Sequence, residues 1–299
     1  MHTPVLLQEV ALGLALREGD TVVDATVNGG GHAEMIAKAI GETGVLVGFD
    51  LDRDALSMAR KRLEGAPCKV VLVESNFTEA GAKLKAQGIT GVDKFLFDLG
   101  LSSNQLDPQS GGIGRGFSFR RDEPLIMTFK TEGGAEGRKN AAEIVNSMSE
   151  RELADMLWTY GQERASRKIA KAIVAARAKQ RILTTEELVS VIERVAPRRG
   201  RIHPATKTFQ ALRIFVNDEL ENLKLGLGEA RKALRAGGRI AVISFHSLED
   251  KIVKEIFKTW QEEGGGAVIT KKPIIPTREE AQRNPRSRSA KLRIFEKQI

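Results

Sequence analysis

The stretch TVVDATVNGGGHAEMI, residues 21–36, decides the fold, because a short apolar run leads into three glycines, a histidine and a helix-like pattern. A strand, a tight glycine turn and an amphipathic helix form the opening unit of a parallel crossover. Further apolar strand-like runs at residues 45–50, 68–75 and 94–100 alternate with helix-like text. This alternation predicts an α/β fold with a mostly parallel sheet.

The alternation stops after residue 100. Residues 101–137 are rich in Gly, Ser, Arg and Pro, and a polar loop of this length is usually functional or disordered. The segments that follow show only helical patterns, and one long helix is expected over about residues 206–234. A strand-like pattern then returns at GGRIAVISF, residues 237–245. We therefore predict a sheet domain formed by residues 1–105 and 206–299, with an all-helical domain inserted at 106–205.

Two helix starts in the inserted segment carry a clear local signature. Ser149 is followed by Glu152, and Thr184 by Glu187, each just ahead of an apolar periodic run. A hydroxyl and a glutamate at this spacing satisfy each other's backbone donors, so both pairs predict capping boxes.

Composition excludes several classes of protein. The chain has 299 residues with 41% hydrophobic content, and it holds neither an apolar run of about 18 residues nor a signal-peptide pattern. We expect a cytoplasmic protein without membrane contact. Cys68 is the only cysteine and the four histidines are scattered, so we expect no disulfide framework and no metal site.

Charge is segregated along the chain, whose net charge is +8. Residues 161–208 hold twelve bases and four acids, and residues 271–299 hold nine bases and three acids, which leaves an acidic remainder. This separation fits an acidic body for a cationic ligand and basic surfaces for a polyanion. Each basic block is also compatible with an ordinary solvated helix face.

Three classes of cofactor compete for the glycine loop. A phosphate-binding P-loop needs Lys and then Ser or Thr after the last glycine, but His32 and Ala33 follow Gly31. A dinucleotide fingerprint needs a third glycine where Glu34 stands, and a carboxylate in the first helical turn repels a pyrophosphate. S-adenosylmethionine, which is cationic and has no phosphate, fits best.

Ligand-type residues also end the predicted strands. Asp24, Asp50 and Asp98 end the first, second and fourth strands, and Phe77 follows the third, where its ring can stack on adenine. A nicotinamide dinucleotide would also use Asp50, and any strand-end aspartate can simply cap the next helix. Four such strand ends together favour S-adenosylmethionine.

Asp98 begins the stretch DLGLSSNQLD and is the candidate catalytic residue. The exocyclic amine of a nucleobase is a poor nucleophile because its lone pair is delocalised into the ring, so an acceptor that holds the amine and takes its proton assists methyl transfer. Ser102, Ser103 and Asn104 are candidate substrate neighbours, although a turn of these residues also satisfies its own backbone.

His246 in SFHSLED is a second catalytic candidate, as a substrate contact or proton acceptor at the end of a strand. It is equally compatible with a structural role. Spacing predicts that Ser247, with Asp250, caps the following helix. Trp158 and Tyr160 lie at helical spacing and are predicted to be core residues.

Several blocks together resemble the ribosomal RNA small-subunit methyltransferase H family, also called MraW. They span nearly the whole chain in the family's order and are HTPVLLQEV, DATVNGGGH, GFDLD, SNF, DLGLSSNQLD, RGFSF, ATKTFQALRIFVNDEL, SFHSLED and NPRSRSAKLR. One block departs from the family: PLIMTFK, residues 124–130, stands where the family usually has PLDMRMD, so two acids and one base are absent.

The resemblance implies methylation, with S-adenosylmethionine, of the exocyclic N4 of a cytidine in the decoding region of 16S ribosomal RNA. It implies a Rossmann-like S-adenosylmethionine-dependent methyltransferase sheet with an inserted all-helical domain for substrate recognition, and 16S rRNA of the small ribosomal subunit as partner. Its cofactor contacts fall on Gly30, Gly31, His32, Asp50, Phe77, Asp98 and Gln105.

RNA contacts are expected from arginine-rich segments that can hold phosphates. The candidates besides the serines and asparagine named above are Arg198, Arg199, Arg201, Arg286 and Arg288. Two other functions stay open: an N4-cytosine DNA methyltransferase, although the usual Pro-Pro-aromatic stretch is absent, and an RNA-binding ribosome assembly factor that uses the cofactor only as a ligand. A homodimer also stays open.

Overall fold

A computed structural model describes residues 4–101, 114–130, 139–197, 200 and 203–298. The chain divides into two compact units, Met1–Ser102 with Leu220–Ile299, and Ser103–Glu219. The first unit therefore resumes at Leu220, later than the expected residue 206. The single helix expected over residues 206–234 is broken at Asp218, whose φ is +48°, and its first half packs within the second unit.

The first unit is built on a seven-stranded sheet in the order β3-β2-β1-β4-β5-β7-β6. Neighbours from β3 to β5 are parallel, whereas β7 is antiparallel to both β5 and β6. The mostly parallel α/β sheet is thus confirmed. The strands are β1 Thr21–Asp24, β2 Val45–Asp50, β3 Lys69–Glu74, β4 Val92–Asp98, β5 Leu234–Ser244, β6 Gly266–Val268 and β7 Lys291–Lys297.

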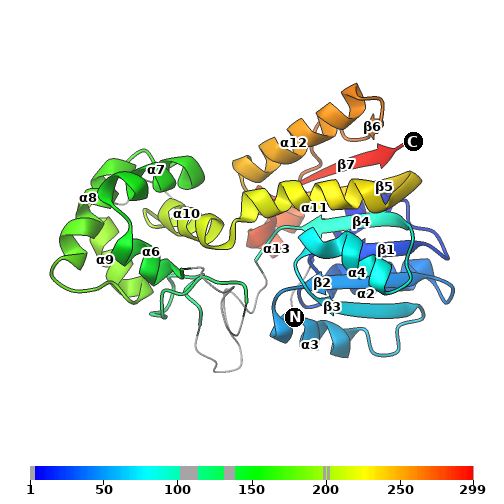
Figure 1. The fold of residues 1–299 in the computed structure, drawn as a ribbon, viewed down its shortest axis with the longest axis horizontal. Helices are drawn as coiled ribbons and strands as arrows, with labels where there is room; N and C mark the ends of the chain where they lie inside the picture. Colours follow the sequence, from blue (N-terminus) through cyan, green and yellow to red (C-terminus); the bar gives the residue numbers. More distant parts are fainter. Residues whose placement is uncertain (1–3, 102–113, 131–138, 198–199, 201–202, 299) are drawn as a thin grey trace. The chain divides into compact units, whose positions relative to one another are not determined.

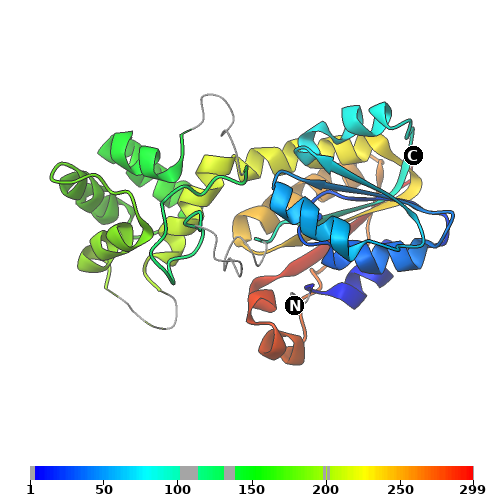
Figure 2. The same cartoon turned by 90° about the horizontal axis from the view of Figure 1, so that it is seen from below.

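Helices cover both faces of this sheet. Figure 1 shows α11 and α12 in yellow and orange over one face, and Figure 2 shows α2 and α3 in blue over the other. Alternate residues of the parallel strands β1 to β5 join the two apolar clusters, as Leu46 and Val47 do in β2, which explains why these strands are continuous apolar runs in the sequence. The helices of this unit are α1 Leu7–Leu14, α2 Gly31–Ile40, α3 Arg53–Arg62, η1 Phe77–Glu79, α4 Ala80–Ala86, α11 Glu219–Ala233, α12 Ser247–Glu262, α13 Arg278–Arg283 and η2 Pro285–Ser289.

Strand order places a ligand-binding edge beside β1. The chain moves outward from β1 to β2 and β3, then returns to the other side of β1 as β4. Loops on either side of such a reversal diverge at the carboxyl ends of the strands and leave a crevice there. In the part of the chain that the structure describes, no helix is long and apolar enough to cross a membrane.

The second unit is helical in its described ranges. Its helices are α6 Ala141–Ser147, α7 Glu150–Gly161, α8 Ser166–Arg177, α9 Thr185–Val195 and α10 Thr206–Asn217. Both predicted capping boxes are present, at the starts of α7 and α9. The prediction that Trp158 is a core residue is wrong, because this residue of α7 is 60% exposed. Tyr160 is half-buried, with its ring 6.0 Å from that of Phe215.

Side chains of neighbouring residues hold the backbone of residues 124–130, the segment that departs from the family pattern. Asn217 accepts a hydrogen bond from the Phe129 amide at 2.9 Å and donates one to the Met127 carbonyl at 2.7 Å. Arg115 donates to the Phe129 carbonyl at 2.8 Å. These bonds do not involve the side chains of Ile126, Thr128 or Lys130. The segment is therefore held in place without the charges that the family usually has there.

Candidate active site

Glycine is required in the loop between β1 and α2. Gly30 has a φ of +79°, in the left-handed region, and a Cβ there would lie 3.1 Å from the Ala59 Cα. A Cβ on Gly31 would lie 2.6 Å from Cγ of Pro4. A side chain at either position would strain the backbone or displace the N-terminal segment. The two glycines therefore let the chain turn sharply from β1 into α2.

His32 begins the buried side of α2 and lies between two acceptors. Its Nε2 is 2.9 Å from the carbonyl oxygen of Val5, and its Nδ1 is 3.3 Å from Oδ2 of Asp98. Because a carbonyl and a carboxylate accept hydrogen bonds, this arrangement favours a proton on both ring nitrogens, the imidazolium form. Burial opposes that charge, but the hydrogen bond and charge of Asp98 and the charge of Asp24 raise the pKa of His32 above its ordinary value.

Asp24 and Asp50 are two further carboxylates at the same edge of the sheet. Burial raises the pKa of Asp24 to about 7, against the opposing charge of His32 and a hydrogen bond from the Thr26 amide. Burial also raises the pKa of Asp50 to about 6, although its oxygens accept hydrogen bonds from the amides of Asn28 and Asp52, each at 2.9 Å. Each carboxylate is therefore costly to ionise without a cation nearby.

Asp98 presents an acceptor that nothing in the described chain satisfies. Its amide donates to Oγ1 of Thr26 at 2.7 Å, and its Oδ2 faces His32, whereas the buried Oδ1 has no hydrogen-bond partner among the described residues. A buried carboxylate oxygen without a donor costs free energy. With two buried carboxylates, the half-buried carboxylate of Asp50 and a buried histidine, the site fits a ligand that brings positive charge or N–H donors.

Phe77 lies beside this edge but packs within the protein. Its ring meets the ring of Phe97 edge-on, with centroids 5.4 Å apart. A Cβ on Gly226 of α11 would collide with the same ring, so the glycine makes room for it. Its predicted contact with adenine stays a prediction.

His246 acts as the N-cap of α12. Its Nδ1 accepts from the Glu249 amide at 3.4 Å, and the Glu249 carboxylate in turn accepts from the His246 amide at 3.2 Å. The predicted cap of Ser247 with Asp250 is wrong by one residue, because a histidine nitrogen replaces the usual hydroxyl. The buried Nε2 lies 3.1 Å from Oε1 of Glu249 but lacks hydrogen-bond geometry. The nitrogen lone pair that a general base needs is thus already engaged in the cap.

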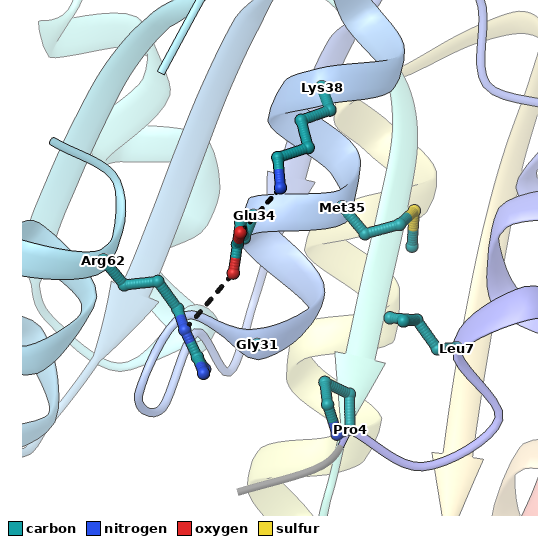
Figure 3. Close-up of a pocket in the computed structure, with 7 residues that line it drawn as sticks. All are labelled: Pro4, Leu7, Gly31, Glu34, Met35, Lys38 and Arg62. Carbon is teal, nitrogen blue, oxygen red and sulfur yellow. Dashed lines mark hydrogen bonds and ion pairs between the residues drawn. The ribbon is translucent and has the colours of Figure 1, made fainter. Parts of the chain in front are cut away.

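Glu34 does not join Asp24, Asp50 and Asp98. It lies on the exposed side of α2, where it pairs with Lys38 at 2.7 Å and Arg62 at 3.4 Å, and these partners lower its pKa. Figure 3 shows the three side chains at one side of a cavity of about 300 Å³. Pro4, Leu7, Gly31 and Met35 complete its lining. The charge that was expected to repel a pyrophosphate is therefore neutralised by two bases.

Sequence reasoning missed the contacts made by the main chain. The Val5 carbonyl, which fixes the His32 ring, carries no signal in the identity of its side chain. Thr26, which receives the Asp98 amide, lies within DATVNGGGH and could have been chosen as a polar residue after a strand. Arg286 and Arg288 are exposed on η2. The remaining predicted positions lie outside the described residues, and they are Ser102, Ser103, Asn104, Gln105, Arg198, Arg199 and Arg201.

The sheet order, the glycine turn and the acidic strand ends define a Rossmann-like methyltransferase. The chain belongs to the MraW methylase family, whose family model matches residues 1–298.

Curated relatives match along the same length. "Ribosomal RNA small subunit methyltransferase H" of Coprothermobacter proteolyticus is 44% identical over 299 residues, which covers 100% of this chain and 96% of the relative. The protein of the same name from Koribacter versatilis is 47% identical, covering 98% of this chain and 92% of the relative. A solved rRNA methylase from Streptococcus thermophilus is 10% identical, with a TM-score of 0.46 and coverage of 100% of this chain and 99% of that one.

Proposed function

We propose that this protein uses S-adenosylmethionine to methylate the exocyclic N4 of a cytidine in the decoding region of 16S ribosomal RNA, within the small ribosomal subunit in the cytoplasm. The observation that carries the proposal is the unsatisfied Oδ1 of Asp98 at the end of β4, in a site of net negative charge. Whole-length similarity to relatives named as ribosomal RNA methyltransferases supports the choice of substrate.

Asp98 is the proposed acceptor for the target amine. A bound S-adenosylmethionine supplies an electrophilic methyl group on a positively charged sulfur. The free Oδ1 of Asp98 can accept a hydrogen bond from the N4 amine, orient its lone pair and take the proton that the amine loses. Holding the amine in this way replaces the random orientation that it has in water.

His32 is the proposed positioning residue for Asp98. Its buried ring engages Oδ2 of Asp98 through Nδ1, so that Oδ1 alone remains available. Asp24, which is costly to ionise in the free protein, would be stabilised in its charged form by a cationic cofactor. Asp50 is proposed to accept hydrogen bonds from ribose hydroxyls through the lone pairs that its backbone donors leave free.

His246 is less suited to receive the proton, because its Nδ1 already caps α12. We retain it as a candidate substrate contact. The two other functions differ from the main proposal in measurable ways. A DNA methyltransferase would label duplex DNA in preference to ribosomal RNA, and an assembly factor would bind RNA without transferring a methyl group.

The test uses small subunits purified from bacteria that lack this methyltransferase, incubated with the protein and radiolabelled S-adenosylmethionine. We expect label in N4-methylated cytidine after digestion of the 16S rRNA. Asp98→Ala should keep RNA binding and lose more than about 99% of the methyl transfer, as expected when a group acting in the transition state is removed. No label in cytidine with the wild-type protein would refute the proposal, and an unchanged rate in the variant would remove Asp98 from the mechanism.

A further inference from the structure

The second unit carries an exposed row of bases on and beside α8. Within the helix, Arg167, Lys168 and Lys171 are exposed, whereas Ile169 and Ile173 are buried. At 100° per residue, the three bases lie within an arc of about 100° on the side opposite the buried residues. Three exposed bases flank the helix in sequence, and the full set, here called the α8 basic surface, is Arg164, Arg167, Lys168, Lys171, Lys179 and Arg181.

These neighbouring bases lack acidic partners, as single exposed bases such as Lys61 and Lys254 do elsewhere in the described ranges. On the first unit, exposed bases commonly pair with a carboxylate, as Arg53 does with Glu74 at 2.8 Å and Arg235 with Asp93 at 2.9 Å. Within the described ranges, no carboxylate forms an ion pair with any side chain of the α8 basic surface. The surface therefore keeps its full positive charge.

The charges are also unfavourable for the helix itself. Arg167 and Lys168 stand in the first turn of α8, which has no acidic residue and no side-chain cap. Neighbouring α7 and α9 both begin with glutamates and capping boxes. Bases at a helix N-terminus are unfavourably placed in the field of the helix dipole. Helix stability therefore does not explain why these residues are basic.

We propose that the α8 basic surface binds the phosphodiester backbone of the RNA substrate. Phosphates in RNA form extended arrays of negative charge, and a row of unpaired bases on one helix face matches such an array. The binding is independent of base identity, so the surface supplies affinity while the site at Asp98 selects the base. This inference rests on the proposed function for the identity of the RNA.

The test compares two triple variants with equal loss of charge. The first is Arg167→Gln, Lys168→Gln and Lys171→Gln on α8. The matched control is Lys251→Gln, Lys254→Gln and Lys258→Gln, three exposed lysines on α12 of the first unit, two of which pair with glutamates. Binding to protein-free 16S rRNA is measured at several salt concentrations, and methylation of small subunits is measured in parallel.

We expect the α8 variant to reduce the slope of log Kd against log salt by about 2, because each lost phosphate contact removes about 0.7–0.9 from the slope. Its affinity at 0.15 M salt should fall by about tenfold or more. Its KM for subunits should rise with kcat unchanged, and its melting temperature should not decrease. The control should retain the wild-type slope.

An α8 variant with the same salt slope as the control would overturn the proposal. A raised KM for subunits together with an unchanged slope on protein-free 16S rRNA would also overturn it, because the surface would then contact an acidic protein of the subunit. If the wild-type protein transfers no methyl group but binds RNA with a steep slope that the α8 variant loses, the surface is supported and the proposed function fails.

Discussion

Replacing Asp24 by Asn should stabilise the free protein at high pH. The pKa of Asp24 is about 7 in the folded chain, against an ordinary value of 3.8, because burial disfavours its charge. A raised pKa means that the folded state keeps the proton longer than the unfolded state does. The contribution of this group to stability is therefore full below pH 3.8 and is lost as pH rises through 7. Asparagine has no charge to form, and its oxygen can still accept the Thr26 amide.

The expected magnitude follows from the two pKa values. At pH 8 the ionised Asp24 costs the folded protein about 4 kcal/mol, and at pH 5 the cost is roughly 2 kcal/mol. The difference in unfolding free energy between variant and wild type should thus grow by about 2–3 kcal/mol in favour of the variant from pH 5 to pH 8. Because Asp24 also raises the pKa of His32, the His32 ring should titrate at lower pH in the variant.

Urea unfolding at pH 5 and pH 8 measures this difference, and calorimetric titration with S-adenosylmethionine measures the proposed function of the charge. We expect the variant to bind the cationic cofactor more weakly while being more stable. Asp155→Asn, which changes a 69% exposed carboxylate on α7, is the control and should alter stability little at either pH. A difference between the Asp24 variant and wild type that is the same at pH 5 and pH 8 would refute the reasoning.

Three further changes test other parts of the structure. Gly30→Ala should destabilise the protein by about 1–2 kcal/mol in urea unfolding, since alanine is strained at a φ of +79°; no loss would mean that the loop adopts another conformation. Asp250→Asn should cost about 3 kcal/mol at pH 7, because it leaves the buried Arg293 without the carboxylate 2.6 Å away. Burial opposes the charge of Asp250, but Arg293 and Lys291 lower its pKa overall. The greater stability of the wild type over the variant should therefore shrink as pH falls below about 4. The ¹⁵N resonances of His32 should indicate an imidazolium at pH 7, and a neutral ring would contradict the two-donor arrangement.

Local patterns were sufficient to predict much of the fold. Ser149 with Glu152 and Thr184 with Glu187 start helices because a cap acts within four residues of chain, and the strands around Asp24, Asp50 and Asp98 are visible as apolar runs. Prediction was less successful where tertiary packing decides. The break at Asp218 divides a segment whose sequence is helical on both sides, and the outward position of Trp158 depends on which face of α7 packs against its neighbours.

The sequence by itself determined the glycine turn and the order in which acids end the strands. Only the tertiary structure decided the charges at the site, because Val5, His32 and Asp98 are far apart in the chain and meet through α2 and the pairing of β1 with β4. Burial and the partners within hydrogen-bond reach set a pKa, and neither can be read from neighbouring letters. For the same reason, the unpaired bases of α8 appear only in three dimensions, where pairing depends on which carboxylates lie nearby.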